Sequence, residues 1–155
     1  MNILMTGIDH ERADIAQREH FSFVAGRVSE LDAAIRQRTG VEGCVMLSTC
    51  SRTELYLHCA EDAFPDPAAL LCEVAGQDVD SCRRMFVSKD GEEAIVHLME
   101  VACGLRSQIL GEDQIISQVK QAVQIARDAK TAGPVLETLF RCAVTAGKKV
   151  RSGDS

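Results

Sequence analysis

The chain has 155 residues, of which 46% are apolar and 26% are charged, and these proportions are typical of one compact globular domain. Seventeen basic and 23 acidic residues give a net charge of −6. That charge argues against a protein that coats a nucleic-acid backbone with a broad basic face, although it allows a local contact with one end of an RNA. The longest charge-free apolar stretch is too short to span a membrane.

The chain has seven cysteines, an odd number, and no two of them form a Cys-x-x-Cys pair. The N-terminus has no charged leader or cleavage site of the kind that precedes secreted, disulfide-rich domains. A disulfide scaffold, a zinc ribbon and a thioredoxin-like motif are therefore not supported. Most of the cysteines lie in apolar runs and are expected to be small core residues in a reducing, cytoplasmic compartment.

The first half of the chain alternates between strand-like and helix-like patterns. Cys50, Ser51 and Arg52 separate two of the expected strands, which predicts a hairpin-like pair with Cys50 at its tip. The expected elements are a strand over 2–8, a helix from Ser29 to Gly40, strands over 43–49 and 53–60, a helix over 67–75 and a strand over 84–88.

The second half is predicted to be helical. The sequence Asp-Gly-Glu-Glu at 90–93 is typical of a capping box at the start of a helix, which Gly104 is expected to end. A second long helix is expected to start near 111–113. Gly133 and Pro134 separate it from a last helix over 135–151, which has no obvious partner within the chain and is interpreted as the start of a connector.

The order of elements is therefore β-α-β-β-α-β followed by helices. This order is that of an α+β, ferredoxin-like sandwich, in which helices cover one face of an antiparallel sheet. We divide the chain into a domain over 1–133 and the start of a connector helix over 134–155.

The stretch LSTCSRTELY, over 47–56, places Cys50 directly after an apolar strand and two residues before Arg52. A thiolate is the nucleophilic form of cysteine, and a nearby cation favours that form. Hydroxyl groups of Thr49 and Ser51 flank the sulfur. Cys50 could be one more buried cysteine at the end of a strand, but its polar neighbours distinguish it from Cys44 or Cys103.

The stretch HLMEVACGLRSQILGEDQIISQVK, over 97–120, holds further candidates. His97 is expected on the flank of its helix, beside the buried stripe, and a lone helical histidine is more often packed or solvated than catalytic. Ser107 and Gln114 stand on either side of the loop before the next helix, where side chains converge on pockets. Glu112 and Asp113 are most simply first-turn charges that oppose the helix dipole.

Together these two stretches resemble the two signature regions of the glutamyl-tRNA reductase family, in the same order and at a similar separation. The resemblance extends over essentially the whole chain. It implies a protein of three domains, of which this chain holds the catalytic one, while the nicotinamide-binding domain and the helical dimerisation domain lie outside it. No Gly-x-Gly-x-x-Gly fingerprint occurs in the sequence.

The resemblance also implies an activity: NADPH-dependent reduction of glutamyl-tRNA to glutamate-1-semialdehyde through a thioester on Cys50, on the route to 5-aminolevulinate and the tetrapyrroles. This chain would carry only the part that forms the thioester. The family implies a homodimer through a domain absent here, and glutamate-1-semialdehyde aminomutase as the downstream partner. No metal is implied, and no residue of this chain is expected to bind NADPH.

By this resemblance Cys50 and His97 are the catalytic residues, and Thr49, Arg52, Ser107 and Gln114 form the substrate pocket. Arg52 is suited to hold the glutamate side-chain carboxylate through paired hydrogen bonds. Glu54 is interpreted as structural, as a partner of Arg52 or a support for the loop. The sequence departs from the family pattern at three positions, which are Ser51 for the usual Asn, Arg106 for Asp and Gln108 for Met.

Two alternatives of other classes stay open. One is a tRNA- or protein-binding module with an inert cysteine, and the acidic charge weighs against the RNA version of it. The other is a small cytosolic thiol hydrolase or redox sensor built around Cys50.

Overall fold

The computed structural model describes residues 2–107 and 114–153. In chain order its elements are β1 (Asn2–Asp9), α1 (Ile15–Glu19), α2 (Ala25–Arg36), β2 (Val41–Ser48), β3 (Arg52–Cys59), α3 (Pro67–Val74), α4 (Val79–Cys82), the 3-10 helix η1 (Arg83–Met85), β4 (Val87–Asp90), α5 (Gly91–Ala102), α6 (Gln114–Asp128) and α7 (Gly133–Ser152).

The four strands form one antiparallel sheet in the order β2-β3-β1-β4. This is the strand order of a ferredoxin-like sandwich, so the predicted fold class is confirmed. The register places Gly7 opposite Glu54 and Asp9 opposite Arg52 on the two central strands. Successive side chains of a strand point to opposite faces, so each central strand contributes to both layers of the protein.

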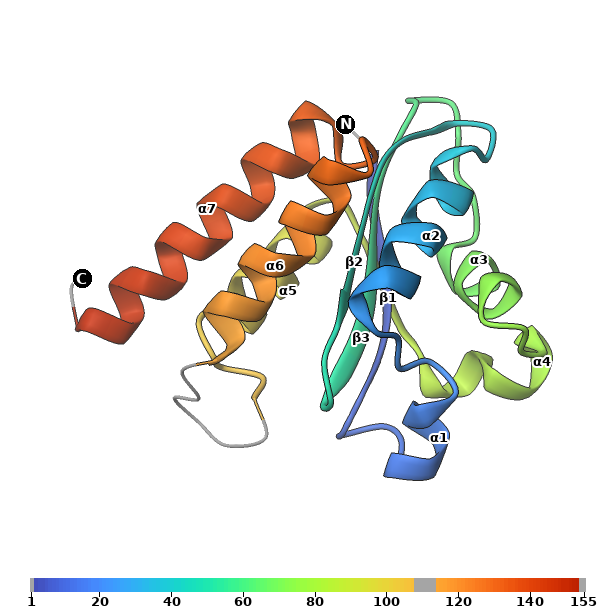
Figure 1. Cartoon of the computed structure of the whole chain (residues 1–155), viewed down its shortest axis with the longest axis horizontal. Helices are drawn as coiled ribbons and strands as arrows, with labels where there is room; N and C mark the ends of the chain where they lie inside the picture. The colour runs from blue at the N-terminus through green and yellow to red at the C-terminus, as the bar shows by residue number, and fades with distance from the viewer. Residues whose placement is uncertain (1, 108–113, 154–155) are drawn as a thin grey trace.

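Helices cover both faces of the sheet, which corrects the expectation of a single covered face (Figure 1). One apolar core joins the sheet to α2, α3 and α4, and a second core joins it to α5, α6 and α7. The correction has a simple cause. The helices that follow β4 return over the face that a minimal ferredoxin-like unit leaves bare, because the alternating apolar residues of the strands supply a second face to bury.

The last helix, α7, is packed within the chain, and the expectation that it lacks a partner is wrong. Its buried stripe includes Leu136, Phe140 and Ala143, which lie in the second core with α5 and α6. Gly147 makes the contact tight, because a Cβ atom there would lie 2.5 Å from the Ala102 carbonyl oxygen of α5. The division at residue 134 and the connector role of α7 stay predictions.

Three local expectations differ from the structure. The short helix α1 was not expected, although Asp14 and Gln17 form a capping box that starts it. The predicted strand over 84–88 is instead η1 followed by β4, which begins three residues later than expected. Asp90 is the N-cap of α5 but makes no side-chain capping hydrogen bond, so the capping box expected over 90–93 is absent. The expected start of the second long helix, at 111–113, lies outside the described residues.

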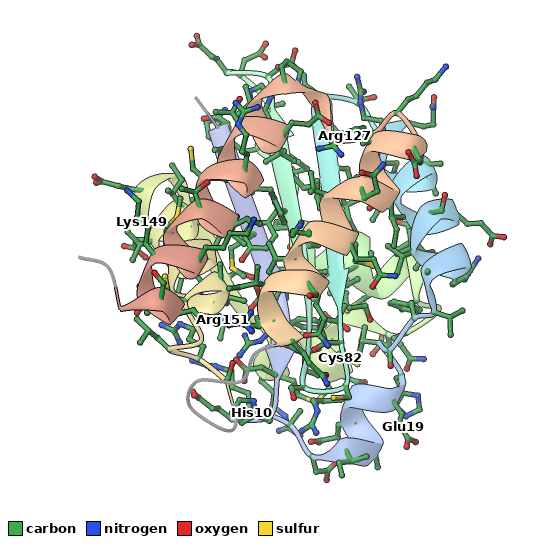
Figure 2. The ribbon with its side chains drawn as sticks, turned by 60° about the vertical axis from the view of Figure 1, so that its left-hand side comes forward. His10, Glu19, Cys82, Arg127, Lys149 and Arg151 are labelled. Carbon is green, nitrogen blue, oxygen red and sulfur yellow. The ribbon has the colours of Figure 1, made fainter. Side chains whose placement is uncertain are left out.

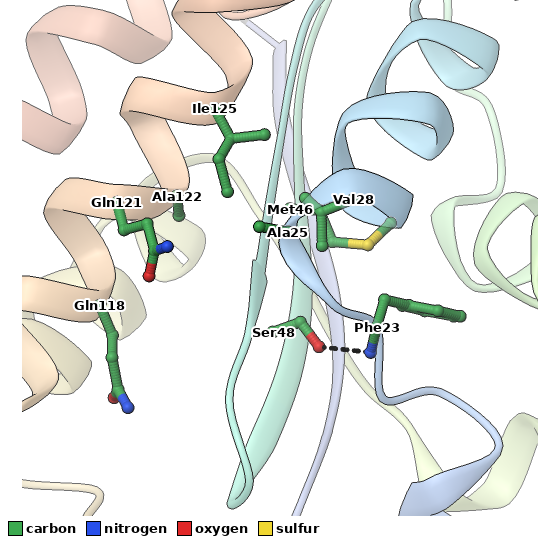
Figure 3. Close-up of a pocket in the computed structure, with 9 residues that line it drawn as sticks. All are labelled: Phe23, Ala25, Val28, Met46, Ser48, Gln118, Gln121, Ala122 and Ile125. Carbon is green, nitrogen blue, oxygen red and sulfur yellow. Dashed lines mark hydrogen bonds between the residues drawn. The ribbon is translucent and has the colours of Figure 1, made fainter.

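The edge strand β2 is covered by contacts from both layers. The Cys44 amide donates a hydrogen bond to the Thr131 carbonyl oxygen at 2.7 Å, and the Thr131 hydroxyl donates to the Cys44 carbonyl oxygen at 3.0 Å. Near the other end of the strand, the Phe23 amide donates to Ser48 Oγ at 3.1 Å. A hollow of about 70 Å³ between α2, β2 and α6 remains beside that bond (Figure 3). These contacts protect an edge that could otherwise pair with another strand.

Asp32 of α2 completes the cover of the β2 edge from inside the first core. Its fully buried carboxyl accepts hydrogen bonds from the Cys44 thiol at 3.5 Å and from the Met46 amide. Burial raises the pKa of Asp32 from 3.8 to about 8, and the two hydrogen bonds oppose that rise only in part. The acid is therefore mostly protonated in the folded protein at neutral pH.

None of the helices formed by residues 2–107 and 114–153 combines the length and the apolar character that a bilayer crossing requires.

We expect Asp32→Asn to stabilise the protein more at pH 8 than at pH 5, because the cost of the Asp32 charge grows as pH rises between these values. The folded state holds the Asp32 proton more tightly than the unfolded state, so the wild type loses stability as pH rises from about 4 to about 8, by at most ~1.4 kcal/mol per pH unit. An asparagine keeps the acceptor and carries no charge. Urea unfolding at both pH values measures the difference, with the exposed Asp62→Asn as control. A wild type that is as stable as the variant at pH 8 would contradict the account.

Candidate active site

Cys50 lies in the turn between β2 and β3, and backbone hydrogen bonds hold that turn. Thr49 Oγ1 accepts from the amides of Ser51 and Arg52, both at 3.2 Å, and the Thr49 amide donates to the Arg52 carbonyl oxygen at 2.8 Å. The His10 amide donates to the Ser51 carbonyl oxygen at 3.1 Å, which ties the turn to the end of β1. The predicted hairpin with Cys50 at its tip is therefore present, and Thr49 is the residue that shapes it.

The thiol of Cys50 is exposed, whereas most of the other cysteines are buried. Its Sγ lies 3.8 Å from Ser51 Oγ. Cys142 on α7 is also exposed, but it stands on a helix face away from the polar turn. Burial raises the pKa of four other thiols and so disfavours their thiolates; these are Cys44, Cys59, Cys103 and Cys72, whose pKa rises to about 11.

A buried polar cluster lies directly behind the turn, and Glu54 is its centre. Glu54 Oε2 accepts from Arg52 Nη1 at 2.9 Å and pairs with His97 Nε2 at 2.7 Å, while Glu54 Oε1 accepts from the Tyr56 hydroxyl at 2.8 Å. All four side chains are at most 3% exposed. We call these four residues the Glu54 cluster. It joins α5, through His97, to the central strand β3.

The charges of the cluster compensate one another. Burial alone would raise the pKa of Glu54, but the hydrogen bond and charge of His97, the charge of Arg52 and the Tyr56 hydroxyl together hold that pKa below its ordinary value of 4.5. The pKa of Tyr56 is raised well above its ordinary value, first by burial and then by the negative charge of Glu54. Asp9 adds a second carboxylate 3.8 Å from Arg52. Glu54 is thus an ionised acceptor.

Arg52 also connects the cluster to the segment after α5. Its Nη2 donates to the Arg106 carbonyl oxygen at 2.5 Å. The Arg106 guanidinium forms an ion pair with Glu100, whose Oε1 lies 3.3 Å from Nη2. The positive charge that Arg106 introduces, where the family usually has Asp, is therefore paired with an acidic neighbour. Ser107 follows, half-buried, with its amide donating to the Gly104 carbonyl oxygen at 3.3 Å.

The predicted site residues are thus brought together to different degrees. Cys50, Thr49 and Arg52 share the turn, and His97 meets Arg52 through Glu54. The expectation that His97 lies beside the buried stripe of its helix is wrong, because it is 1% exposed and part of that stripe. Gln114 is the exposed first residue of α6. Gln108, Glu112 and Asp113 lie outside the described residues.

Tyr56 and Gly7 were not identified from the sequence as part of the site, and Glu54 was assigned only a supporting role. The period of two along β3 contained the signal, since Arg52, Glu54 and Tyr56 share one face of a strand. Gly7 is paired with Glu54 in the register, and a Cβ atom at position 7 would lie 2.7 Å from Glu54 Cγ and 3.1 Å from the Thr53 carbonyl oxygen. The absence of a side chain at residue 7 therefore makes room for the central carboxylate.

Within residues 2–107 and 114–153, no group of three or more His, Cys, Asp or Glu side chains is arranged to hold a metal ion. What the site offers is an exposed thiol on a fixed turn, backed by a buried, charge-compensated arginine. This combination defines a class of protein, an α+β domain that presents an exposed cysteine on a polar turn in front of a buried ionic cluster.

Comparisons with known proteins define the family. Residues 6–153 match the family described as Glutamyl-tRNAGlu reductase, N-terminal domain. Glutamyl-tRNA reductase of Alkaliphilus oremlandii is 45% identical over 98% of this chain, and the probable multifunctional siroheme biosynthesis protein HemA of Ruminiclostridium josui is 44% identical over 98%. The solved glutamyl-tRNA reductase of Methanopyrus kandleri superposes with a TM-score of 0.80 at 32% identity over 97% of the chain. The chain belongs to the glutamyl-tRNA reductase family and matches its N-terminal domain.

The match covers only part of these relatives. The chain spans 46% of the Alkaliphilus oremlandii protein, 30% of the Ruminiclostridium josui protein and 34% of the Methanopyrus kandleri chain.

We predict that Cys50 alkylates fastest of the seven cysteines in the folded protein at neutral pH. It is exposed on a polar turn, whereas burial disfavours the thiolates of most of the others. Brief exposure to iodoacetamide followed by peptide mapping measures the order. Cys142 is the internal control, because it is also exposed but lies on a helix rather than on the polar turn, and faster labelling of Cys142 would refute a special reactivity at Cys50.

We predict that Glu54→Gln destabilises the protein by about 3–5 kcal/mol at neutral pH, because it leaves the Arg52 guanidinium buried without its nearest carboxylate. The pKa of Glu54 is lowered in the folded state, so its stabilising effect is present above about 4.5 and is lost as pH falls through the folded-state pKa. The gap in unfolding free energy between wild type and variant should therefore narrow in acid.

The matched control for this prediction is Tyr56→Phe, which removes one neutral donor to the same carboxylate and should cost about 1 kcal/mol. Guanidinium chloride unfolding of the three proteins at pH 7 and pH 4 measures both effects. Equal costs for the two substitutions at pH 7 would show that the charge of Glu54 is not what holds the cluster.

Proposed function

We propose that the chain carries out the first half of glutamyl-tRNA reduction, in which Cys50 takes the glutamyl group from its tRNA as a thioester. The observation that carries this proposal is the exposed Cys50 thiol on a turn fixed by Thr49, directly in front of the Glu54 cluster. The thiolate sulfur attacks the ester carbonyl carbon, a C–S bond forms, and the C–O bond to the terminal ribose breaks. The tRNA leaves with a free ribose hydroxyl, whose oxygen takes a proton from water in place of the proton that the Cys50 thiol has lost.

Arg52 is proposed to hold the side-chain carboxylate of the glutamyl group. Two of its donor nitrogens are engaged, Nη1 with Glu54 and Nη2 with the Arg106 carbonyl oxygen. The guanidinium side chain is only 2% exposed, so a substrate carboxylate must replace one of the groups that cover it. The Arg106 carbonyl is the better candidate for replacement, because a neutral oxygen binds a guanidinium less strongly than an ionised carboxylate does.

His97 is proposed to act mainly as a positioning residue. Its Nε2 faces Glu54, and its Nδ1 is buried without a hydrogen-bond partner among the described residues. A 1% exposed histidine bonded to a carboxylate is well placed to fix Glu54, and through it Arg52. Direct proton transfer by His97 to the substrate stays a prediction, as do the pocket roles of Ser107 and Gln114.

The second half of the reaction is proposed to take place on parts of the enzyme that this chain does not contain. A thioester carbonyl accepts a hydride more readily than an ester does, and NADPH would supply that hydride to release glutamate-1-semialdehyde for tetrapyrrole synthesis. No Gly-x-Gly-x-x-Gly fingerprint occurs in the 155 residues. Dimerisation, transfer of the product to the aminomutase and a cytoplasmic location belong to the same proposal for the whole enzyme.

We predict that glutamyl-tRNA forms a single glutamyl adduct on this chain and that NADPH does not convert it to semialdehyde. Intact-mass spectrometry after mixing detects the adduct, which water should remove slowly. Cys50→Ser should abolish it, whereas Cys142→Ser, which removes the other exposed thiol, should leave it unchanged. An adduct that survives Cys50→Ser, or oxidation of NADPH by the chain alone, would disprove the proposal.

A further inference from the structure

The charge of the chain is divided unevenly between its parts. Residues 114–153, which form α6, α7 and their connection, contain seven of the 17 basic residues but only two of the 23 acidic ones. That stretch has a net charge of +5, whereas the remainder of the chain has −11, which together give the overall −6. A moderate net charge thus conceals a strongly basic pair of helices on a strongly acidic domain.

The basic side chains line a groove between the two helices, which lie side by side (Figure 2). Its volume is about 280 Å³. Lys120, Arg141 and Lys148 are exposed there and form no ion pair with any residue in the described ranges, while Arg127 pairs with Glu137 through Nε at 2.5 Å. The large apolar side chains of the lining, Val123, Phe140 and Val144, are each at most 9% exposed.

The spacing of these cations suits a chain of anions better than a single one. Lys120 and Arg127 are seven residues apart on α6, and Arg141 and Lys148 are seven residues apart on α7. Seven residues are two helical turns, or roughly 10.5 Å of rise. Each helix therefore presents one cation near each end of the groove, and together they form two rows that follow the groove along its length.

We infer that the groove between α6 and α7 binds the phosphodiester backbone of the tRNA. Phosphates attract lysine and arginine without requiring apolar contacts, whereas an acidic protein partner would be expected to use large apolar anchors, and the large apolar side chains of this groove are buried. This inference rests on the proposed function, because it assigns the backbone to the same RNA whose glutamyl end reaches Cys50. The position of the groove agrees with this inference, because α6 begins at the end of the molecule where the β2–β3 turn lies (Figure 1).

The test compares two triple variants with the same change in charge. Lys120, Arg141 and Lys148 are replaced by Gln in the groove variant, and the exposed Arg27, Arg38 and Arg84 are replaced by Gln in the control. Both are made in a Cys50→Ser background, so that binding is measured without chemistry. Fluorescence anisotropy with uncharged tRNA for glutamate gives Kd over a range of salt concentrations.

We expect the groove variant to bind at least tenfold more weakly than its parent at about 0.1 M salt, and to have a shallower salt dependence by about two to three counterions. The control should bind nearly as its parent does. Unchanged binding in the groove variant, or an equal loss in the control, overturns the inference. So does poly-glutamate that binds the groove as tightly as the tRNA does, because the surface would then select an acidic polypeptide equally well.

A second measurement separates this inference from the proposed function. With Cys50 restored, the groove variant should still form the thioester from glutamyl-adenosine, which has the reactive ester but no phosphates, and should form it at least tenfold more slowly from sub-saturating glutamyl-tRNA. Loss of the adduct with both substrates shows damage to the site of Cys50 and overturns the groove as a separate element. An adduct with neither substrate in the wild type contradicts the proposed function, while the binding data still decide the groove.

Discussion

The buried carboxylate of Glu54 is the constraint on which the site depends. A charge on the central strand of a sheet costs several kcal/mol unless it is paired and hydrogen-bonded, and Glu54 satisfies this requirement with Arg52, Tyr56 and His97. Two of these partners lie on the same face of β3, and the third requires α5 to pack on that face. Gly7 leaves the space that the carboxylate occupies. Arg52, which compensates the charge of Glu54, is also the residue at which the Cys50 turn ends. The pairing of Glu54 with Arg52 therefore fixes where that turn lies.

The two faces of the sheet differ in how they accommodate buried acidic side chains. The face toward α5, α6 and α7 combines an apolar core with the Glu54 cluster at the end where Cys50 lies. The opposite face is apolar apart from Asp32 and a few hydroxyls, and Asp32 remains neutral there because burial raises its pKa to about 8. Glu54 is ionised because the Arg52 guanidinium and two hydrogen-bonding side chains contact it, whereas Asp32 is protonated because no cation contacts it. The face that holds the Glu54 cluster can thus stay charged without making the whole sheet polar.

Much of this architecture was predictable from the sequence, and the failures have physical causes. The strands, the long helices and the turn at Cys50 could be predicted because each depends on residues that are neighbours in the sequence. The pairing of Glu54 with His97 joins residues 43 positions apart, so no local pattern contains it. The start of β4 was misplaced by three residues because η1 uses residues that also suit a strand. The partner of α7 was missed because the second face of the sheet had been left uncovered in the expected fold.

The distribution of charge modifies what net charge alone suggests about RNA. A value of −6 argues against a broad basic coat, and the structure agrees, since the remainder of the chain outside α6 and α7 carries −11. The field around a folded protein depends on where its charges lie, and an acidic surface repels a polyanion while a basic groove attracts it. If an RNA approaches this domain, the acidic faces therefore restrict its orientation. Discrimination by repulsion in this way requires few cations, so the proposed groove needs only a small basic surface on an acidic domain to orient an RNA.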